Sequence, residues 1–61
     1  MTKLKQMRKS RRVSQCELAQ GIGVAQGAVS RWETGKAKPS LENMIAIARY
    51  FNCKVDDLID K

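Results

Sequence analysis

A segment of twenty residues near the middle of the chain, 15–34, constrains the fold more than any other part of the sequence. Two stretches with helical patterning lie there, separated by Gly21–Ile22–Gly23. Ser14 can accept the first backbone N–H groups of a helix, and Glu17 follows three positions later, so that the pair forms a capping box. We therefore expect one helix over 15–20, which the glycines end, and a second helix over 26–34.

Two helices that cross closely make specific demands on the sequence. They need a small residue where they touch, a turn residue that tolerates positive φ, and apolar side chains on their buried faces. The small residue is Ala19, the turn residue is Gly23, and the apolar positions are Leu18, Ile22, Val24, Val29 and Trp32. These seven positions predict a helix-turn-helix motif.

The remainder of the chain also predicts helices, because no stretch alternates strictly between apolar and polar residues. We expect a helix over 2–11, a fourth helix after the N-cap Ser40 through Tyr50 or Phe51, and a short last helix over 55–59. The apolar positions of the fourth helix are Leu41, Met44, Ile45, Ala48 and Phe51. The expected fold class is therefore all-α, a compact bundle of five short helices, with residues 1–61 as a single small domain.

The charge of the chain is unevenly distributed. Residues 1–38 hold nine basic and two acidic residues, a net charge of +7, whereas residues 39–61 carry a net charge of −1. A localised basic field on a small domain attracts a polyanion, most often nucleic acid. General solubility remains an alternative explanation. A membrane surface is a weaker one, because residues 2–12 offer only Leu4 and Met7 as an apolar face.

Other residue types exclude several classes of protein. Cys16 and Cys53 are expected to be reduced thiols, and without a histidine they cannot complete a four-ligand zinc site. The absence of histidine and of room for a cleft also speaks against an enzyme. We expect no metal, cofactor or small-molecule substrate. No signal peptide or membrane-spanning run is present, so the expected location is cytoplasmic, associated with the nucleoid.

Five separated segments resemble the phage-repressor and Cro type of helix-turn-helix family, also called Xre-like. They are the Leu-x-x-x-Arg of Leu4–Arg8, the Ser-Gln-x-Glu-Leu-Ala of 14–19, the Gly-Val of 23–24, the Val-Ser-Arg-Trp-Glu-x-Gly of 29–35 and the Pro-Ser-Leu of 39–41. The resemblance continues to Val55–Leu58. It implies a five-helix DNA-binding domain that acts as a homodimer on a two-fold double-stranded operator.

The resemblance also implies roles for individual residues. The base-contacting residues would be Gln26, Gly27, Ser30 and Arg31, and the phosphate-contacting residues would be Gln15, Thr34, Lys36 and Lys38. Arg8 and Glu33 would form a structural ion pair between the first and third helices. Two positions depart from the family pattern. Ala25 caps the recognition helix poorly, and Gly27 replaces what is often a polar reader.

The sequence thus predicts a sequence-specific DNA-binding transcriptional regulator, a repressor, whose third helix enters the major groove. The C-terminal apolar residues Val55, Leu58 and Ile59 could support a dimer or only close the core of the monomer. The alternative function is an antitoxin or another protein-interaction module on the same fold.

Overall fold

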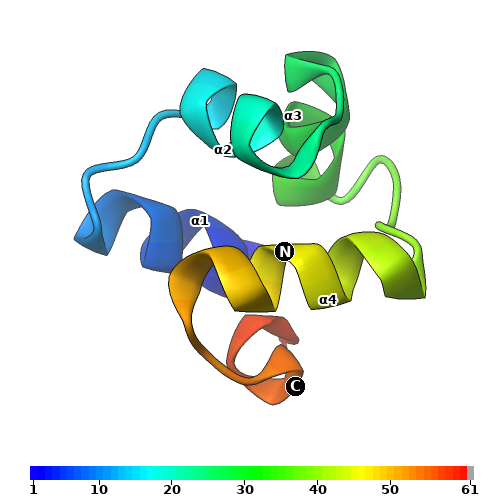
Figure 1. Cartoon of the computed structure of the whole chain (residues 1–61). Coiled ribbons are helices and arrows are strands. Elements are labelled where there is room, and N and C mark those ends of the chain that lie inside the picture. Colours follow the sequence, from blue (N-terminus) through cyan, green and yellow to red (C-terminus); the bar gives the residue numbers. More distant parts are fainter. Residues whose placement is uncertain (61) are drawn as a thin grey trace.

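The computed structural model describes residues 1–60, in which four α-helices are followed by one 3-10 helix. The elements are α1 (Thr2–Ser10), α2 (Gln15–Ile22), α3 (Gln26–Thr34), α4 (Leu41–Phe51) and η1 (Val55–Leu58). Figure 1 shows α2 and α3 together on one side of the molecule, with α4 crossing below them and η1 on the far side. The all-α class is confirmed for residues 1–60, but the expected fifth α-helix over 55–59 is instead a 3-10 helix of four residues.

The helix-turn-helix segment follows local chemistry closely. The Glu17 N–H donates to Ser14 Oγ at 2.9 Å, and the Ser14 N–H donates to Glu17 Oε1 at 3.1 Å, so the capping box is present. The second helix does not end at residue 20 but continues to Ile22, because it is Gly23 that takes the left-handed conformation, with φ of 79°. The third helix has the expected bounds, and its N-cap Ala25 makes no side-chain hydrogen bond.

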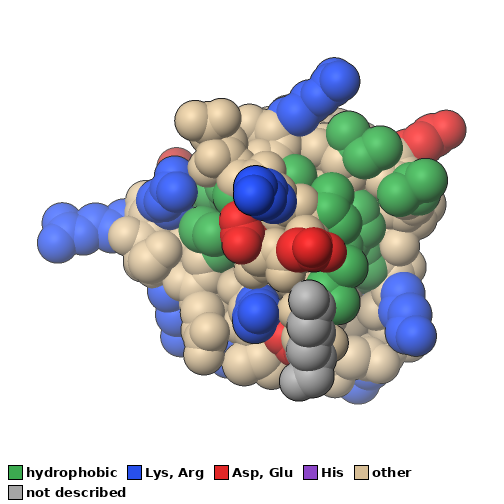
Figure 2. Space-filling view, turned by 90° about the horizontal axis from the view of Figure 1, so that it is seen from below, with side chains coloured by type: hydrophobic (Ala, Val, Ile, Leu, Met, Phe, Trp, Pro, Cys, Tyr) green, Lys and Arg blue, Asp and Glu red, His purple; other side chains and the backbone are tan. Residues whose placement is uncertain are grey.

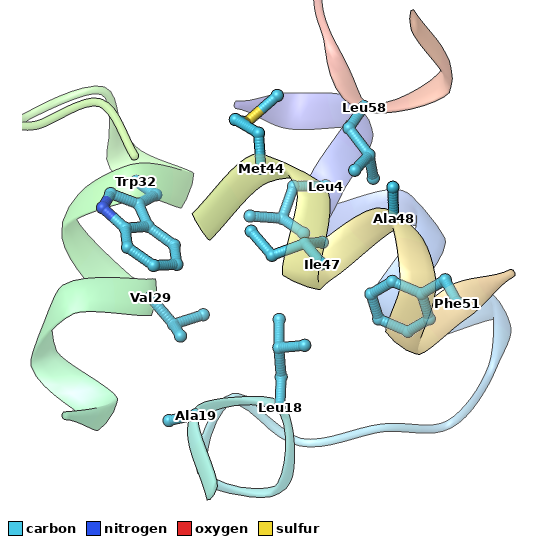
Figure 3. Packing of buried hydrophobic residues seen from close by; sticks show 10 residues of the cluster. All are labelled: Leu4, Leu18, Ala19, Val29, Trp32, Met44, Ile47, Ala48, Phe51 and Leu58. Carbon is cyan, nitrogen blue, oxygen red and sulfur yellow. The ribbon is translucent and has the colours of Figure 1, made fainter. Parts of the chain in front are cut away.

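The hydrophobic core lies where α2 and α3 meet α4. Figure 3 shows Leu18, Val29 and Trp32 converging on the α4 residues Ile47 and Met44. The buried set is Leu4, Leu18, Ala19, Val29, Trp32, Met44, Ile47, Ala48, Phe51 and Leu58. Each large apolar side chain in it contributes about 1.5–3 kcal/mol by leaving water. The core thus fixes how the α2–α3 unit sits on the rest of the domain.

The expected apolar face of α4 was partly wrong. Leu41 and Ile45 are 71% and 40% exposed, whereas Ile47 is fully buried. The buried residues Met44, Ile47, Ala48 and Phe51 also follow i, i+3, i+4, i+7 spacing, displaced by three positions along the helix. Two overlapping stripes fit the sequence, and the packing of α4 against α2 and η1 selects the second.

Residue 60 closes the fold onto the start of α1. The Asp60 carboxylate accepts the backbone N–H of Thr2 at 2.7 Å and that of Lys3 at 2.9 Å. The first turn of α1 has no acidic residue of its own. An acid 58 positions along the chain from Thr2 therefore satisfies two of the N–H groups that the start of a helix leaves without partners.

Candidate nucleic-acid interface

The outer surface of α3 presents the residues that the sequence predicted to contact bases. Gln26, Gly27 and Arg31 are exposed, and Ser30 is half-buried. Val29 and Trp32, from the opposite face of the same helix, are buried at 0% and 4% exposure. This separation leaves a polar helical surface that faces away from the core.

A chain of side-chain hydrogen bonds connects this surface with the interior. Gln26 Nε2 donates to Gln15 Oε1 at 2.8 Å, and Gln15 Nε2 donates to Glu33 Oε1 at 3.0 Å. The Glu33 carboxylate also accepts Arg8 Nε at 2.7 Å and Arg8 Nη2 at 3.0 Å. Arg8 and Glu33 thus form a bidentate ion pair with side chains 10% and 2% exposed. The four residues join α1, α2 and both ends of α3.

The ion pair determines which way the two amides point. An ionised carboxylate can only accept hydrogen bonds, so Gln15 must turn its N–H₂ group toward Glu33. Its oxygen then points away from Glu33 and accepts from Gln26. The Gln26 amide is left with its carbonyl oxygen and one N–H available. Sequence reasoning identified both glutamines but missed their bond, because a spacing of 11 positions between two helices carries no signal.

Glu33 remains charged in its buried position. Burial alone would raise the pKa of this carboxyl group. Hydrogen bonds from Arg8 and Gln15, together with the positive charges of Arg8 and Lys5, outweigh that effect and lower the pKa below its ordinary value of 4.5. The carboxylate therefore stays an acceptor at neutral pH, and the orientation of the amides is maintained.

The residues predicted to contact phosphate lie at both ends of the α2–α3 unit. Gln15 is half-buried at the start of α2, and Lys36 and Lys38 are exposed in the loop beyond α3. The Thr34 hydroxyl donates within its own helix, to the Ser30 carbonyl at 3.0 Å. Thr34 must release this bond before its hydroxyl can donate to a phosphate, so it is the weakest member of the set.

The two cysteines and the length of the helices bear on two further expectations from the sequence. Cys16 is exposed and Cys53 is half-buried, and both are free thiols. Burial and the charge of Asp57 raise the pKa of the Cys53 thiol. None of the helices in residues 1–60 has the length and apolar character needed to cross a bilayer.

The chain belongs to the helix-turn-helix family, in the phage-repressor and Cro type, because the sequence pattern that defines the family matches residues 4–58. One relative is the HTH-type transcriptional activator BcrR of Enterococcus faecalis, 35% identical over 57 residues, or 93% of this chain and 28% of the relative. An uncharacterized HTH-type transcriptional regulator of Archaeoglobus fulgidus is 39% identical over 93% of this chain and 80% of the relative.

Repressor protein C2 of Salmonella phage P22 is 30% identical over 93% of this chain. The match covers 26% of that repressor. The chain thus spans only about a quarter of the length of the activator and of the phage repressor, but most of the archaeal regulator. Members of the family are transcriptional regulators that bind DNA, and the names of these relatives include both an activator and a repressor.

Proposed function

We propose that residues 1–61 form a single DNA-binding domain, which acts in the cytoplasm as a sequence-specific repressor and inserts α3 into the major groove. The observation that carries the proposal is the hydrogen-bonded chain from Arg8 through Glu33 and Gln15 to Gln26. It aims an oriented amide outward from the exposed face of α3. Repression needs only that the operator be occupied.

Gln26 and Arg31 carry the reading of bases in this proposal. The available oxygen and N–H of Gln26 match the N6 donor and N7 acceptor that adenine shows in the major groove. The exposed Arg31 guanidinium suits the two acceptors of guanine. Ser30 is half-buried and contributes less. Gly27 lets the helix backbone come close to the DNA.

Phosphate contacts supply most of the affinity. The net charge of +7 on residues 1–38 provides the field, and Gln15, Lys36 and Lys38 set the position of the domain on the backbone. Thr34 joins them once its intrahelical bond opens.

A homodimer on a two-fold operator completes the proposal. Of the three C-terminal apolar residues, Leu58 is fully buried and Val55 half-buried, which leaves Ile59, 39% exposed, for a partner. Ile59 lines an apolar hollow of about 400 Å³ together with Pro39 and Met44. The hollow is also lined by Trp32 of α3 and by Lys38 of the loop that follows it. Figure 2, which views the molecule from the side opposite α2 and α3, shows hydrophobic side chains among the charged ones. Half-sites would lie about 10 base pairs apart.

The test is binding to random DNA and to a site selected from a random pool, measured by fluorescence anisotropy from 50 to 200 mM salt. If each chain neutralises about 3–5 phosphates, a dimer should give a slope of log K against log salt of roughly −5 to −9. Binding that ignores salt, or no binding, would contradict the proposal. The latter would favour the alternative, an antitoxin or other protein-interaction module, which the 71% exposure of Leu41 would suit.

A pair of variants separates reading from positioning. Arg31→Ala should flatten the preference at one base position, worth roughly 1–3 kcal/mol, and should leave binding to random DNA less affected. Lys38→Ala should weaken both sites by a similar factor and make the salt slope shallower by about one unit per chain. Unchanged base preference in Arg31→Ala would remove Arg31 from the reading surface.

A further inference from the structure

All four α-helices end in the same backbone turn. In each, an N–H donates to the carbonyl five positions earlier: Val13 to Arg8 at 3.0 Å, and Val24 to Ala19, Lys36 to Arg31 and Cys53 to Ala48 at 2.9 Å. The residue before each donor has a left-handed backbone, and these residues are Arg12 (φ 56°), Gly23 (79°), Gly35 (81°) and Asn52 (53°). Glycine usually fills this place and asparagine sometimes does. Arg12 is the exception.

The left-handed backbone of Arg12 lowers the stability of the fold. The Cβ atom of an L residue is disfavoured in the left-handed region, and glycine avoids that penalty. The side chain compensates for none of it within residues 1–60, where it is exposed and makes no hydrogen bond or ion pair. Its neighbours differ: Arg8 binds Glu33, and Arg11 Nη1 donates to the Phe51 carbonyl at 3.1 Å. The guanidinium of Arg12, at a strained backbone position and without a partner in residues 1–60, is therefore available to bind a ligand.

The turn that holds Arg12 is well anchored. The Val13 N–H donates to the Arg8 carbonyl at 3.0 Å, and Arg8 Nη1 donates back to the Val13 carbonyl at 2.8 Å. Arg8 is therefore bonded both to this turn and to Glu33. Three residues of extended chain span at most about 11 Å, so the backbone of Arg12 lies within that distance of Gln15.

The charge around Arg12 also favours an anion. Residues 2–12 contain no acidic residue, and Lys5 and Lys9 are exposed on α1, the helix that precedes Arg12. A phosphate that approaches the start of α2 would meet these cations and no opposing carboxylate from α1. The one carboxylate in the first turn of α2, Glu17, already accepts the Ser14 N–H.

We infer that Arg12 binds a phosphate of the DNA backbone beside the one that Gln15 contacts, so that the phosphate contacts extend from α2 onto the end of α1. The inference rests on the proposed function. It makes Arg12 a contact that adds affinity without reading sequence, since phosphates carry no base information. The strain of the free protein is then offset only when DNA is bound.

The decisive variant is Arg12→Gly, because its thermal stability should rise while its affinity for DNA should fall. Relief of the left-handed strain should raise Tm by about 4–8 °C. DNA affinity should fall about eightfold per chain at 0.1 M salt, equally for selected and random sites, with a salt slope shallower by about 0.9 per chain. Arg12→Lys should keep most of the slope, because it retains the charge.

Two matched controls accompany it. Asn52→Gly changes the other non-glycine left-handed residue and should leave DNA affinity unchanged. Arg49→Ala removes an exposed positive charge from α4 and should leave the salt slope unchanged. Wild-type affinity and slope in Arg12→Gly would overturn the inference while the proposed function stands. A lower Tm in that variant would overturn it as well, since Arg12 would then stabilise the fold. A wild-type protein that does not bind DNA would refute both.

Discussion

Gln26, the first residue of α3, and Gln15, the first residue of α2, share a hydrogen bond of 2.8 Å at the point where the two helices begin. A proposed reader of bases is thus held by a proposed phosphate contact. If both lie on DNA, the position of the backbone and the recognition of one base are linked through this bond.

The link predicts non-additive effects on base preference. Gln26→Ala should lose roughly 1–3 kcal/mol of discrimination at one base pair. Gln15→Ala should flatten the preference at that same base pair, because the Gln26 amide loses its orientation. The double variant should cost less than the sum, which a double-mutant cycle on selected and mismatched sites measures. Gln20→Ala, an exposed change on the same helix, is the control. Additive costs would show that the two side chains act separately on DNA.

Loss of one member of the buried ion pair should be severe. Arg8→Ala leaves the Glu33 carboxylate, 2% exposed, without its counter-charge, which costs about 3–5 kcal/mol. A domain of this size has only about 3–9 kcal/mol in total. Thermal unfolding followed by circular dichroism should therefore show a largely unfolded protein near 37 °C. The double variant Arg8→Met with Glu33→Leu should recover part of the loss. Equal Tm values for Arg8→Ala and the wild type would contradict this role.

Stability should decline in acid. Hydrogen bonds from the backbone of Lys3 and Thr2 lower the pKa of Asp60 below its ordinary value of 3.8, and the Glu33 pKa is lowered as well. A lowered folded-state pKa stabilises the fold above the unfolded-state value, and this contribution disappears as the pH falls through the folded-state value. We expect Tm to be level near neutrality and to drop below about pH 4.5. Asp60→Asn and Glu33→Gln should each have a lower Tm at pH 7 and a shallower drop. A profile in both variants parallel to that of the wild type would refute the assignment.

Two glycines should respond to alanine with opposite signs. At Gly27 a Cβ atom meets nothing within 4 Å, so Gly27→Ala should raise stability by about 0.5–1 kcal/mol. It should also weaken binding to selected DNA, if the backbone of α3 approaches the bases there. At Gly21 a Cβ atom would overlap the Tyr50 ring, so Gly21→Ala should lower Tm. Both Tm values come from thermal melts. Tighter DNA binding by Gly27→Ala would exclude a close approach of the backbone.

The dimer proposal makes a prediction that can be tested with two isoleucines of nearly equal exposure. Ile59, 39% exposed, follows η1 and lines the apolar hollow. Ile45, 40% exposed, belongs to α4 and does not line that hollow. Ile59→Lys should reduce the complex on a two-fold operator from two protein chains to one, as measured by sedimentation, and should change Tm little. Ile45→Lys should leave two chains bound. One chain per operator in the wild type would end the dimer proposal.

Local chemistry accounts for the part of the fold that the sequence predicted. The Ser14 capping box, the left-handed Gly23 and the bounds of α3 all depend on residues within a few positions of one another. The polar outer face of α3 was also predictable, since it is the complement of buried Val29 and Trp32. The proposed roles of its residues stay predictions.

Features that depend on distant contacts were not predictable. The choice between Ile45 and Ile47 as a buried residue of α4 depends on how that helix is rotated against α2 and η1. The cap on α1 comes from Asp60, and the orientation of Gln26 comes from a carboxylate in the last turn of α3, relayed through α2. Neither leaves a pattern in the sequence, because each joins residues whose spacing is set by the tertiary fold.

Because Trp32 is buried, it serves as an intrinsic fluorescence probe of the protein. It is the only tryptophan in the chain, it lies on α3, and its side chain faces the core and not the proposed DNA surface. The fluorescence of the indole therefore reports, without an added label, whether α3 is packed against the core. Its emission should shift to longer wavelength when α3 leaves the core, and the bases of bound DNA should not touch the ring. Trp32 emission thus reports the detachment of the recognition helix, and the fluorescence anisotropy of the binding assay reports the occupancy of the operator, so each event has its own signal.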